Sequence, residues 1–185
     1  EPLSIAMLLA DRDLLGKVEL HASDVSARAL ARAQAGRYGG RCLRGSPHDA
    51  LLDRWASRDE QGVVTSKALR DGVQWSRKNL ADPADITSLG LFDIVFCRNA
   101  LIYFDDPSVL STVRTIAAAL QPGGVLCLGA SESLLRLSTP FVCEEQGGAF
   151  NLYNLPRGEL HGVNLRHMLV PPPGHVFCIA DFSQV

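Results

Sequence analysis

Two short apolar runs, FDIVFC (92–97) and VLCLGA (125–130), constrain the fold of this chain more than any other feature. Each is a nearly continuous apolar run of strand length, which is typical of strands buried on both faces of a parallel sheet. The stretch between them, DPSVLSTVRTIAAAL (106–120), has helical periodicity, with Pro107 in its first turn and QPGG (121–124) as its stop signal. Strand, helix and strand in this order predict an α/β fold.

The remaining segments extend the same alternation. We predict helices at 2–11, 26–36 and 50–55, strands at 17–24 and within VVTSKAL and VQWS, and a terminal hairpin formed by 141–143 and 149–153. Short links between such elements indicate an open sheet of parallel strands. Ligands bind such sheets beyond the carboxyl ends of the strands. Three loops therefore share one rim, and they carry Asp24, Arg98 with Asn99, and Ser131 with Glu132.

Composition narrows the class of protein. The chain has 185 residues, of which 46% are apolar and 21% charged, as in an ordinary globular domain with a small appendage. A net charge of −2 gives no basic surface for nucleic acid or membrane. Five cysteines without C-x-x-C spacing indicate reduced thiols and a cytoplasmic location, and neither they nor the histidines have metal-site spacing. We therefore expect no metal.

The two ends of the sequence indicate that it is a segment of a longer chain. The start, EPLSIAMLLADRD, has no initiator Met and no basic leader, and its apolar run is too short for a signal peptide or a membrane span. The end, ADFSQV, stops within what looks like a structural element. We therefore expect further chain before Glu1.

The polar residues on the predicted rim each allow two interpretations. Asp24 is either the acid that accepts hydrogen bonds from ribose hydroxyls or a solvent-facing cap for the next helix. Asn79, in WSRKNLAD, is by itself a turn residue. Ser131 and Glu132 either face the cleft or cap a helix, and capping is the better interpretation.

The stretch FCRNALIYF carries the most informative of these residues. Arg98 can clamp a carboxylate in a planar, bidentate manner, and Tyr103 can donate a hydrogen bond to the same group. The alternative is a surface bridge from Arg98 to Asp105 or Asp106, with Tyr103 packed as a half-buried aromatic. The residue types alone do not separate these two hypotheses.

Five segments together resemble the chemotaxis-receptor glutamate methyltransferases. They occur in order and at matching spacing over about residues 1–153: EPLSIAMLL, HASDVSARALARAQAGRY, WSRKNL, LFDIVFCRNALIYFDDP and LQPGGVLCLGASESL. The resemblance implies a Rossmann-like methyltransferase sheet with a small antiparallel β-subdomain inserted at roughly 37–76. It implies S-adenosylmethionine as cofactor, and as substrate the glutamate side chains on the cytoplasmic helices of chemoreceptors.

The resemblance also implies roles for individual residues. On the cofactor side, Glu1 matches the second acid of the family's Gly-Glu-Glu-Pro motif, Asp24 the ribose-binding acid, Asn79 and Leu80 the pair that lines the adenine, and Cys97 and Arg98 a cofactor-contacting pair. On the substrate side, Arg98 and Tyr103 match the residues that position the reacting carboxylate. A glutamate is already ionised near pH 7, so this transfer requires orientation rather than a general base.

The chain departs from the family pattern in several places. The family's amino-terminal helical domain and most of its Gly-rich cofactor loop are absent, and Ala130 stands where a His is common. Residues 154–185 form an appendage that resembles the palm motif of family A DNA polymerases, with Asp181 matching a metal-binding aspartate. The following Glu and the second catalytic acid of that motif are not present, and two-metal chemistry requires converging carboxylates. The alternative is a tail in which HVFCIADF pairs as an extra edge strand.

Three functional hypotheses follow. The first is an enzyme that transfers methyl groups to receptor glutamates. The second is a catalytically inactive receptor-binding or regulatory fragment, which we would expect if the partial cofactor loop prevents binding. The third is a fragment of a nucleic-acid enzyme, which predicts DNA binding that weakens steeply with salt, against the near-neutral charge of the chain.

Overall fold

A computed structural model describes residues 1–39, 49–145, 150–154 and 176–181. Seven strands form one sheet in the order β5-β1-β10-β6-β7-β9-β8, and β5, β1, β10, β6 and β7 run parallel. The strands are β1 (Glu19–Asp24), β5 (Val73–Arg77), β6 (Phe92–Arg98), β7 (Leu120–Gly129), β8 (Val142–Glu145), β9 (Phe150–Asn154) and β10 (Val176–Asp181). The predicted α/β class with a parallel sheet is therefore confirmed.

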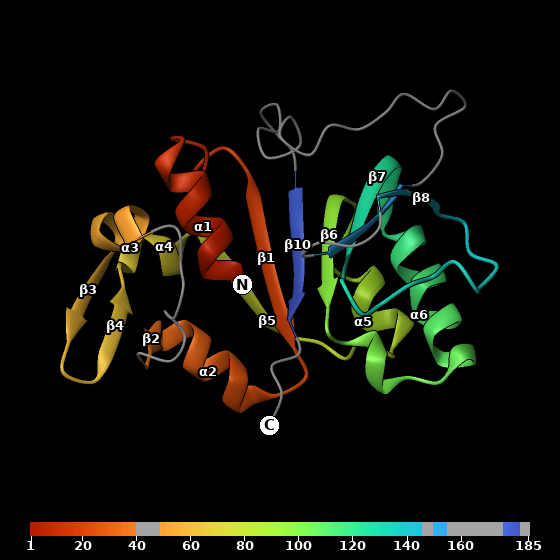
Figure 1. The fold of residues 1–185 in the computed structure, drawn as a ribbon, viewed down its shortest axis with the longest axis horizontal. Coiled ribbons are helices and arrows are strands. Elements are labelled where there is room, and N and C mark those ends of the chain that lie inside the picture. Colours follow the sequence, from red (N-terminus) through yellow and green to blue (C-terminus); the bar gives the residue numbers. More distant parts are fainter. Residues whose placement is uncertain (40–48, 146–149, 155–175, 182–185) are drawn as a thin grey trace.

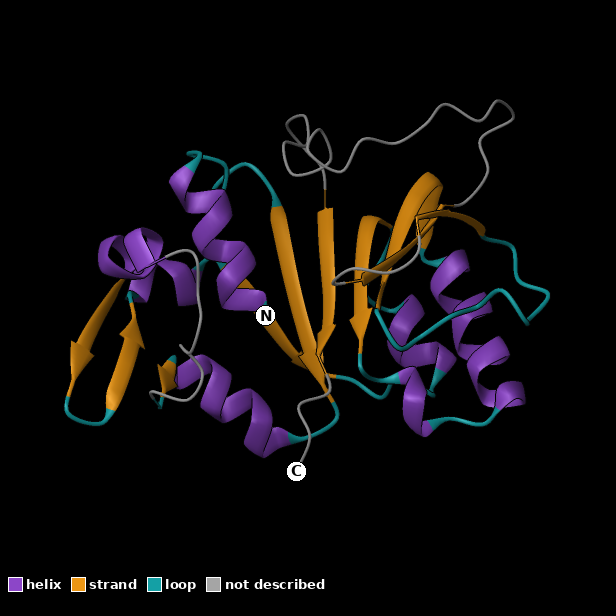
Figure 2. Ribbon diagram, viewed as in Figure 1, coloured by secondary structure: helices purple, strands orange, loops and turns teal. Residues whose placement is uncertain are grey.

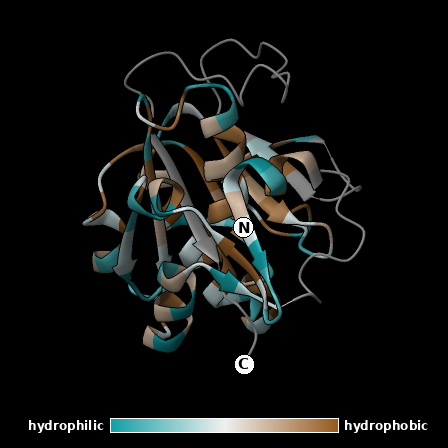
Figure 3. Ribbon diagram, turned by 90° about the vertical axis from the view of Figure 1, so that its left-hand side faces the viewer, coloured by the Kyte–Doolittle hydropathy of each residue, from teal (hydrophilic) through white to brown (hydrophobic). Residues whose placement is uncertain are grey.

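Helices cover both faces of this sheet (Figures 1 and 2). One face carries α1 (Pro2–Asp11) and α2 (Ala27–Ala35), and the other carries α5 (Pro83–Thr87) and α6 (Asp106–Ala118). Side chains of the central strands alternate between the two faces. Ile94 packs into the core on the α1 face, whereas Val95 and Cys97 pack into the core beside α6. Burial on both sides explains the nearly continuous apolar runs, and Figure 3 shows these apolar residues gathered along the strands.

A second, three-stranded antiparallel sheet lies beside the large one, in the order β2-β4-β3. Its strands are β2 (Arg37–Tyr38), β3 (Ala56–Asp59) and β4 (Gly62–Thr65), and α3 (Asp49–Trp55) and α4 (Lys67–Asp71) flank it. This small sheet falls within the expected insertion at 37–76, of which 40–48 lie outside the described residues. The segment VQWS does not belong to it, because β5 pairs with β1 in the large sheet.

Local signals place the ends of α2 (Ala27–Ala35) where the sequence predicts them, whereas α4 and α5 were not predicted. Ser26 caps α2, with its Oγ accepting the Ala29 N–H at 3.2 Å, and Gly36 ends the helix in the left-handed region at φ 66°. Strand β7 begins at Leu120, five residues before the predicted start. Gln121–Gly124 bulge between the Phe92–Leu120 and Ile94–Val125 pairs, so the expected stop signal lies inside the strand.

The strand in the carboxyl-terminal segment corrects an expectation. HVFCIADF was expected at an edge of the sheet, if it paired at all. Instead β10 is a central strand, parallel to β1 on one side and to β6 on the other. The rest of that segment, 155–175 and 182–185, lies outside the described residues. Among the helices that the structure describes, none has the length and apolar character to cross a bilayer.

The hairpin of β8 and β9 forms as predicted and closes the sheet beside β7. Tyr153 of β9 is 2% exposed, and its hydroxyl oxygen accepts the Leu134 N–H at 2.8 Å.

Replacing Tyr153 by Phe leaves this buried N–H without an acceptor, so we expect the free energy of unfolding to fall by about 1–3 kcal/mol. Urea denaturation measures this change. Tyr103→Phe, at a 60% exposed position, is the control and should change stability by less than about 0.5 kcal/mol.

Candidate active site

The carboxyl ends of β1, β10 and β6 meet at one edge of the sheet, where the chain order reverses (Figure 1). An open α/β sheet binds ligands at such a switch point. Asp24 ends β1, Asp181 ends β10, and Arg98 ends β6 in register with Asp181. The predicted common rim is therefore present. The loop after β7, with Ser131 and Glu132, lies next along the same edge.

A cavity of about 470 Å³ opens at this edge, between the start of α1, helix α2 and the end of β1. Glu1 and Asp24 both line it. Its other lining residues include the aromatic side chains of Tyr38 and Trp75 and the arginines at positions 32 and 37. Two carboxylates thus share a pocket with aromatic walls, a combination suited to a small polar ligand that carries a flat ring.

Asp24 combines parts of both interpretations given to it. Its Oδ1 accepts the Ser26 N–H at 2.7 Å, a contact that supports the start of α2. The side chain is not solvent-facing, however, because Asp24 is only 7% exposed and lines the cavity. One carboxylate therefore both organises the turn after β1 and contributes charge to the pocket.

Arg98 forms an ion pair with Glu1 across 97 positions of sequence. This contact joins the end of β6 to the start of α1. The alternative bridges from Arg98 to Asp105 or Asp106 are not formed: Asp105 caps α6 by accepting the Ser108 N–H at 3.0 Å, and Asp106 pairs with Arg136. The Arg136 side chain holds the pKa of Asp106 below its ordinary value. The guanidinium of Arg98 therefore lies beside the carboxylate of Glu1, a residue of the cavity lining.

The other residues named from the sequence lie around this centre, outside the described lining of the cavity. Leu80 and Cys97 are buried in the core on the α6 face. Tyr103 lies in a 3₁₀ turn at Leu101–Tyr103 and is 60% exposed. Asn79 is exposed on the loop after β5. The structure thus places Glu1 and Asp24 in one cavity lining and Arg98 against Glu1, whereas the remaining candidates are not among the residues that line the cavity.

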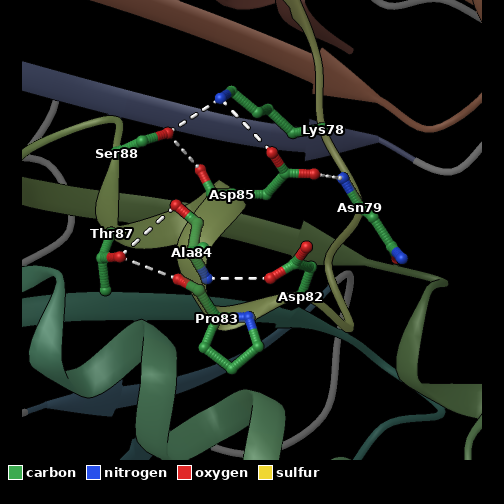
Figure 4. Close-up of polar contacts among 8 residues, drawn as sticks. All are labelled: Lys78, Asn79, Asp82, Pro83, Ala84, Asp85, Thr87 and Ser88. Carbon is green, nitrogen blue, oxygen red and sulfur yellow. Dashed lines mark hydrogen bonds and ion pairs between the residues drawn. The ribbon is translucent and has the colours of Figure 1, made fainter.

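Figure 4 shows how the loop that carries Asn79 is held. The Asn79 N–H donates to Asp85 Oδ2 at 2.8 Å, and the Lys78 ammonium contacts Asp85 Oδ1 at 3.5 Å. The Asn79 side chain accepts the Ala81 N–H at 3.0 Å, as in a turn. Asp85 therefore anchors the segment through its carboxylate.

These contacts predict a pH effect on stability. The Asn79 N–H, and with it Lys78, holds the pKa of Asp85 below its ordinary value of 3.8. A lowered pKa in the folded state means that Asp85 contributes stability above its unfolded pKa, and that this contribution is lost as pH falls through the folded pKa. We expect Asp85→Asn to flatten the fall of unfolding free energy between about pH 5 and 3. Urea titrations at several pH values measure the slope. An unchanged slope would show that Asp85 gains nothing from these contacts.

Glu132 is a residue whose role the sequence did not indicate. It was expected to cap a helix of its own or to face the cleft. In the described stretch 133–145 no helix follows it. Its carboxylate instead accepts backbone N–H groups of the neighbouring loop at Asn99, Ala100 and Leu101. Trp75 and Tyr38 were also missed as pocket residues. The alternation of side chains in VQWS indicated which face of the strand carries Trp75. It could not show which strand pairs with VQWS, and so could not place Trp75 in the pocket.

Comparison with known proteins decides the family. Residues 1–148 match the family model described as the CheR methyltransferase SAM-binding domain. The chain belongs to this family. It is 35% identical over 144 residues to chemotaxis protein methyltransferase 2 of Vibrio cholerae serotype O1, covering 76% of this chain and 50% of that protein. It is 38% identical over 136 residues to the probable biofilm formation methyltransferase WspC of Pseudomonas aeruginosa, covering 73% and 32%.

Among solved structures, the N-methyltransferase NodS of Bradyrhizobium japonicum WM9 in complex with S-adenosyl-L-homocysteine matches with a TM-score of 0.46 and 18% identity, over 75% of this chain and 67% of NodS. The chain spans about half the length of the chemotaxis relative and about a third of WspC. Membership of the CheR family confirms the family resemblance and the methyltransferase class of the sheet.

The described residues of this CheR-type domain give little support for a metal centre or for a cysteine nucleophile. No group of three or more His, Cys, Asp and Glu side chains in the described ranges could hold a metal ion. Burial, and then the charge of Glu1, raises the pKa of the Cys127 thiol to about 12. Cys127 therefore stays protonated near neutral pH and is no nucleophile.

Proposed function

We propose that this chain binds S-adenosylmethionine and transfers its methyl group to glutamate side chains on the cytoplasmic helices of chemoreceptors. The observation that carries the proposal is the cavity at the switch point, where Glu1 and Asp24 line one pocket and Glu1 pairs with Arg98 from the next part of the rim. The family match supports the cofactor and the reaction. A receptor partner of this kind implies that the chain works in the cytoplasm.

The pocket residues fit this cofactor. Asp24 can accept hydrogen bonds from ribose hydroxyls, and Tyr38 and Trp75 offer flat apolar surface to an adenine ring. Glu1 adds a second carboxylate to the lining, shared with Arg98, and acids in this position suit a ligand with a sulfonium and an ammonium group. When bound, the cofactor supplies an electrophilic methyl group.

The protein's own contribution is to orient the substrate. A glutamate carboxylate is ionised near pH 7, so no residue has to remove a proton from it. Arg98 holds the carboxylate through its planar guanidinium, and Tyr103 donates a hydrogen bond to its second oxygen. Tyr103 is exposed and can therefore meet a protein substrate that arrives from outside. Such orientation contributes several kcal/mol of barrier lowering.

The experiment supplies the chain with methyl-labelled S-adenosylmethionine and the cytoplasmic fragment of a chemoreceptor. We expect base-labile label on receptor glutamates, and none when those glutamates are replaced by Gln. Because WspC is a relative, a receptor from a biofilm signalling system is tested in parallel. Calorimetry with S-adenosylhomocysteine measures cofactor binding separately. Receptor binding without cofactor binding or label would instead support the inactive regulatory fragment.

A further inference from the structure

The carboxylate of Glu132 accepts four backbone N–H groups, three from the loop after β6 and one from the end of β7. Its Oε1 accepts from Ala100 at 2.9 Å and from Leu101 at 2.8 Å, and its Oε2 accepts from Asn99 at 2.8 Å and from Gly129 at 2.7 Å. A carboxylate offers about four acceptor directions, two on each oxygen. The four contacts match this number, and every one of them comes from a backbone N–H group. Glu132 therefore holds the backbone of the two neighbouring segments in place.

The backbone of the loop that Glu132 holds has the conformation of an anion-binding site. Asn99 lies in the left-handed region at φ 58°, and Ala100 follows at φ −108° and ψ −46°. Successive left- and right-handed residues turn their N–H groups to one side and form a concave anion site. Glu132, which is 5% exposed, fills that site from the next strand's loop. Without it, the three successive donors of this loop, of which those of Ala100 and Leu101 are buried, would lose this acceptor.

Gly129 makes the close approach possible. A Cβ at this position would lie 2.8 Å from Glu132 Oε2 and 3.3 Å from the Asn99 nitrogen. The Glu132 N–H also donates to the Gly129 carbonyl oxygen at 2.9 Å, which turns the loop back over the strand end. A small residue at 129 and an acid at 132 therefore act together.

The segment that Glu132 holds lies between the two residues proposed to bind the substrate carboxylate. Asn99, Ala100 and Leu101 lie between Arg98 at the end of β6 and Tyr103 in the 3₁₀ turn. We propose that Glu132 is a positioning residue that fixes the spacing and direction of Arg98 and Tyr103, and so the pose of the substrate carboxylate. This inference rests on the proposed function for its catalytic consequence, but its structural part stands on the four contacts alone.

The test compares Glu132→Gln with the wild-type chain. Gln keeps the size but offers one acceptor oxygen and an NH₂ group, so it opposes two of the four donors. We expect amide hydrogen exchange to accelerate at least about tenfold at Asn99, Ala100, Leu101 and Gly129. Amides of Val95 and Leu126, in the centre of the sheet, should keep their wild-type rates and thereby report that the fold is intact.

Kinetics form the second readout. We expect kcat for receptor methylation to fall about 10- to 100-fold, with the Kd for S-adenosylhomocysteine changed less than about threefold. Glu19→Gln, an exposed acid at the opposite end of β1, is the matched control and should leave both values unchanged. Gly129→Ala displaces the carboxylate without changing its charge, and it should reproduce the loss if Glu132→Gln does not fold.

The outcomes separate the two ideas. Wild-type exchange rates at the four amides in both variants, or full turnover despite accelerated exchange, would overturn the positioning role. A wild-type chain that transfers no methyl group would overturn the proposed function instead, and the exchange rates would then decide whether Glu132 holds the loop.

Discussion

Replacing Arg98 by Ala is expected to reduce methyl transfer by at least about a hundredfold while changing cofactor affinity by about tenfold or less. Arg98 is the last residue of β6, at the rim, and its guanidinium already binds the carboxylate of Glu1. The same planar fork suits the substrate carboxylate, whose alignment is the main work of this reaction. Labelled-methyl incorporation into a receptor fragment measures the first effect, and calorimetry with S-adenosylhomocysteine the second.

Two further variants give this prediction its controls. Arg98→Lys keeps the charge but loses the two-pronged geometry, so it should restore only a small part of the activity. Arg114→Ala removes an exposed arginine from α6 and should leave transfer unchanged. Normal turnover in Arg98→Ala would remove Arg98 from the substrate clamp. A loss of cofactor binding as large as the loss of turnover would assign it to the cofactor instead.

Replacing Ile179 by Pro is expected to abolish cooperative folding. Ile179 lies in the middle of β10, opposite Ala22 of β1 and Phe96 of β6. In the part of the chain that the structure describes, β10 lies between β1 and β6 and joins the two halves of the large sheet. Proline has no N–H to donate and is found in sheets almost only at edges or bulges. A break at this position would expose two strand edges in the centre of the molecule.

Thermal unfolding followed by circular dichroism tests this expectation, with size-exclusion chromatography to detect aggregation through the exposed edges. Ile179→Val keeps the backbone N–H and the strand preference, and it should fold with a single transition. A Pro variant that melts like the wild-type chain would show that β10 does not hold the centre of the sheet.

Much of the fold could be predicted because its signals are local. Ser26 and Gly36 mark the ends of α2, and the apolar runs that became β6 and β7 identify strands buried on both faces. Parallel strands place their carboxyl ends together, so the common rim of Asp24, Arg98 and Glu132 also followed. The start of β7 was misplaced because QPGG bulges within the strand, a detail set by pairing with β6.

The site itself was only partly predictable. The sequence supplied the residue types, and the family resemblance supplied their order, yet neither could say that Arg98 binds Glu1 instead of Asp105 or Asp106. Capping motifs likewise suggested that Glu132 serves its own segment, whereas three of its four backbone partners lie about thirty residues earlier. Such contacts depend on which loops the sheet order brings together.

The sequence by itself determined helices α1, α2, α3 and α6 and the strands β6 and β7, because each depends on local signals. The rim on which polar residues gather then followed from the parallel arrangement of the strands. Only the tertiary structure decided that the last described strand lies at the centre of the sheet, that the first residue pairs with Arg98, and that Glu132 ties the loop after β6 to the end of β7. The reason is that these contacts join distant segments, and their free energy depends on pairing and burial that no local pattern encodes.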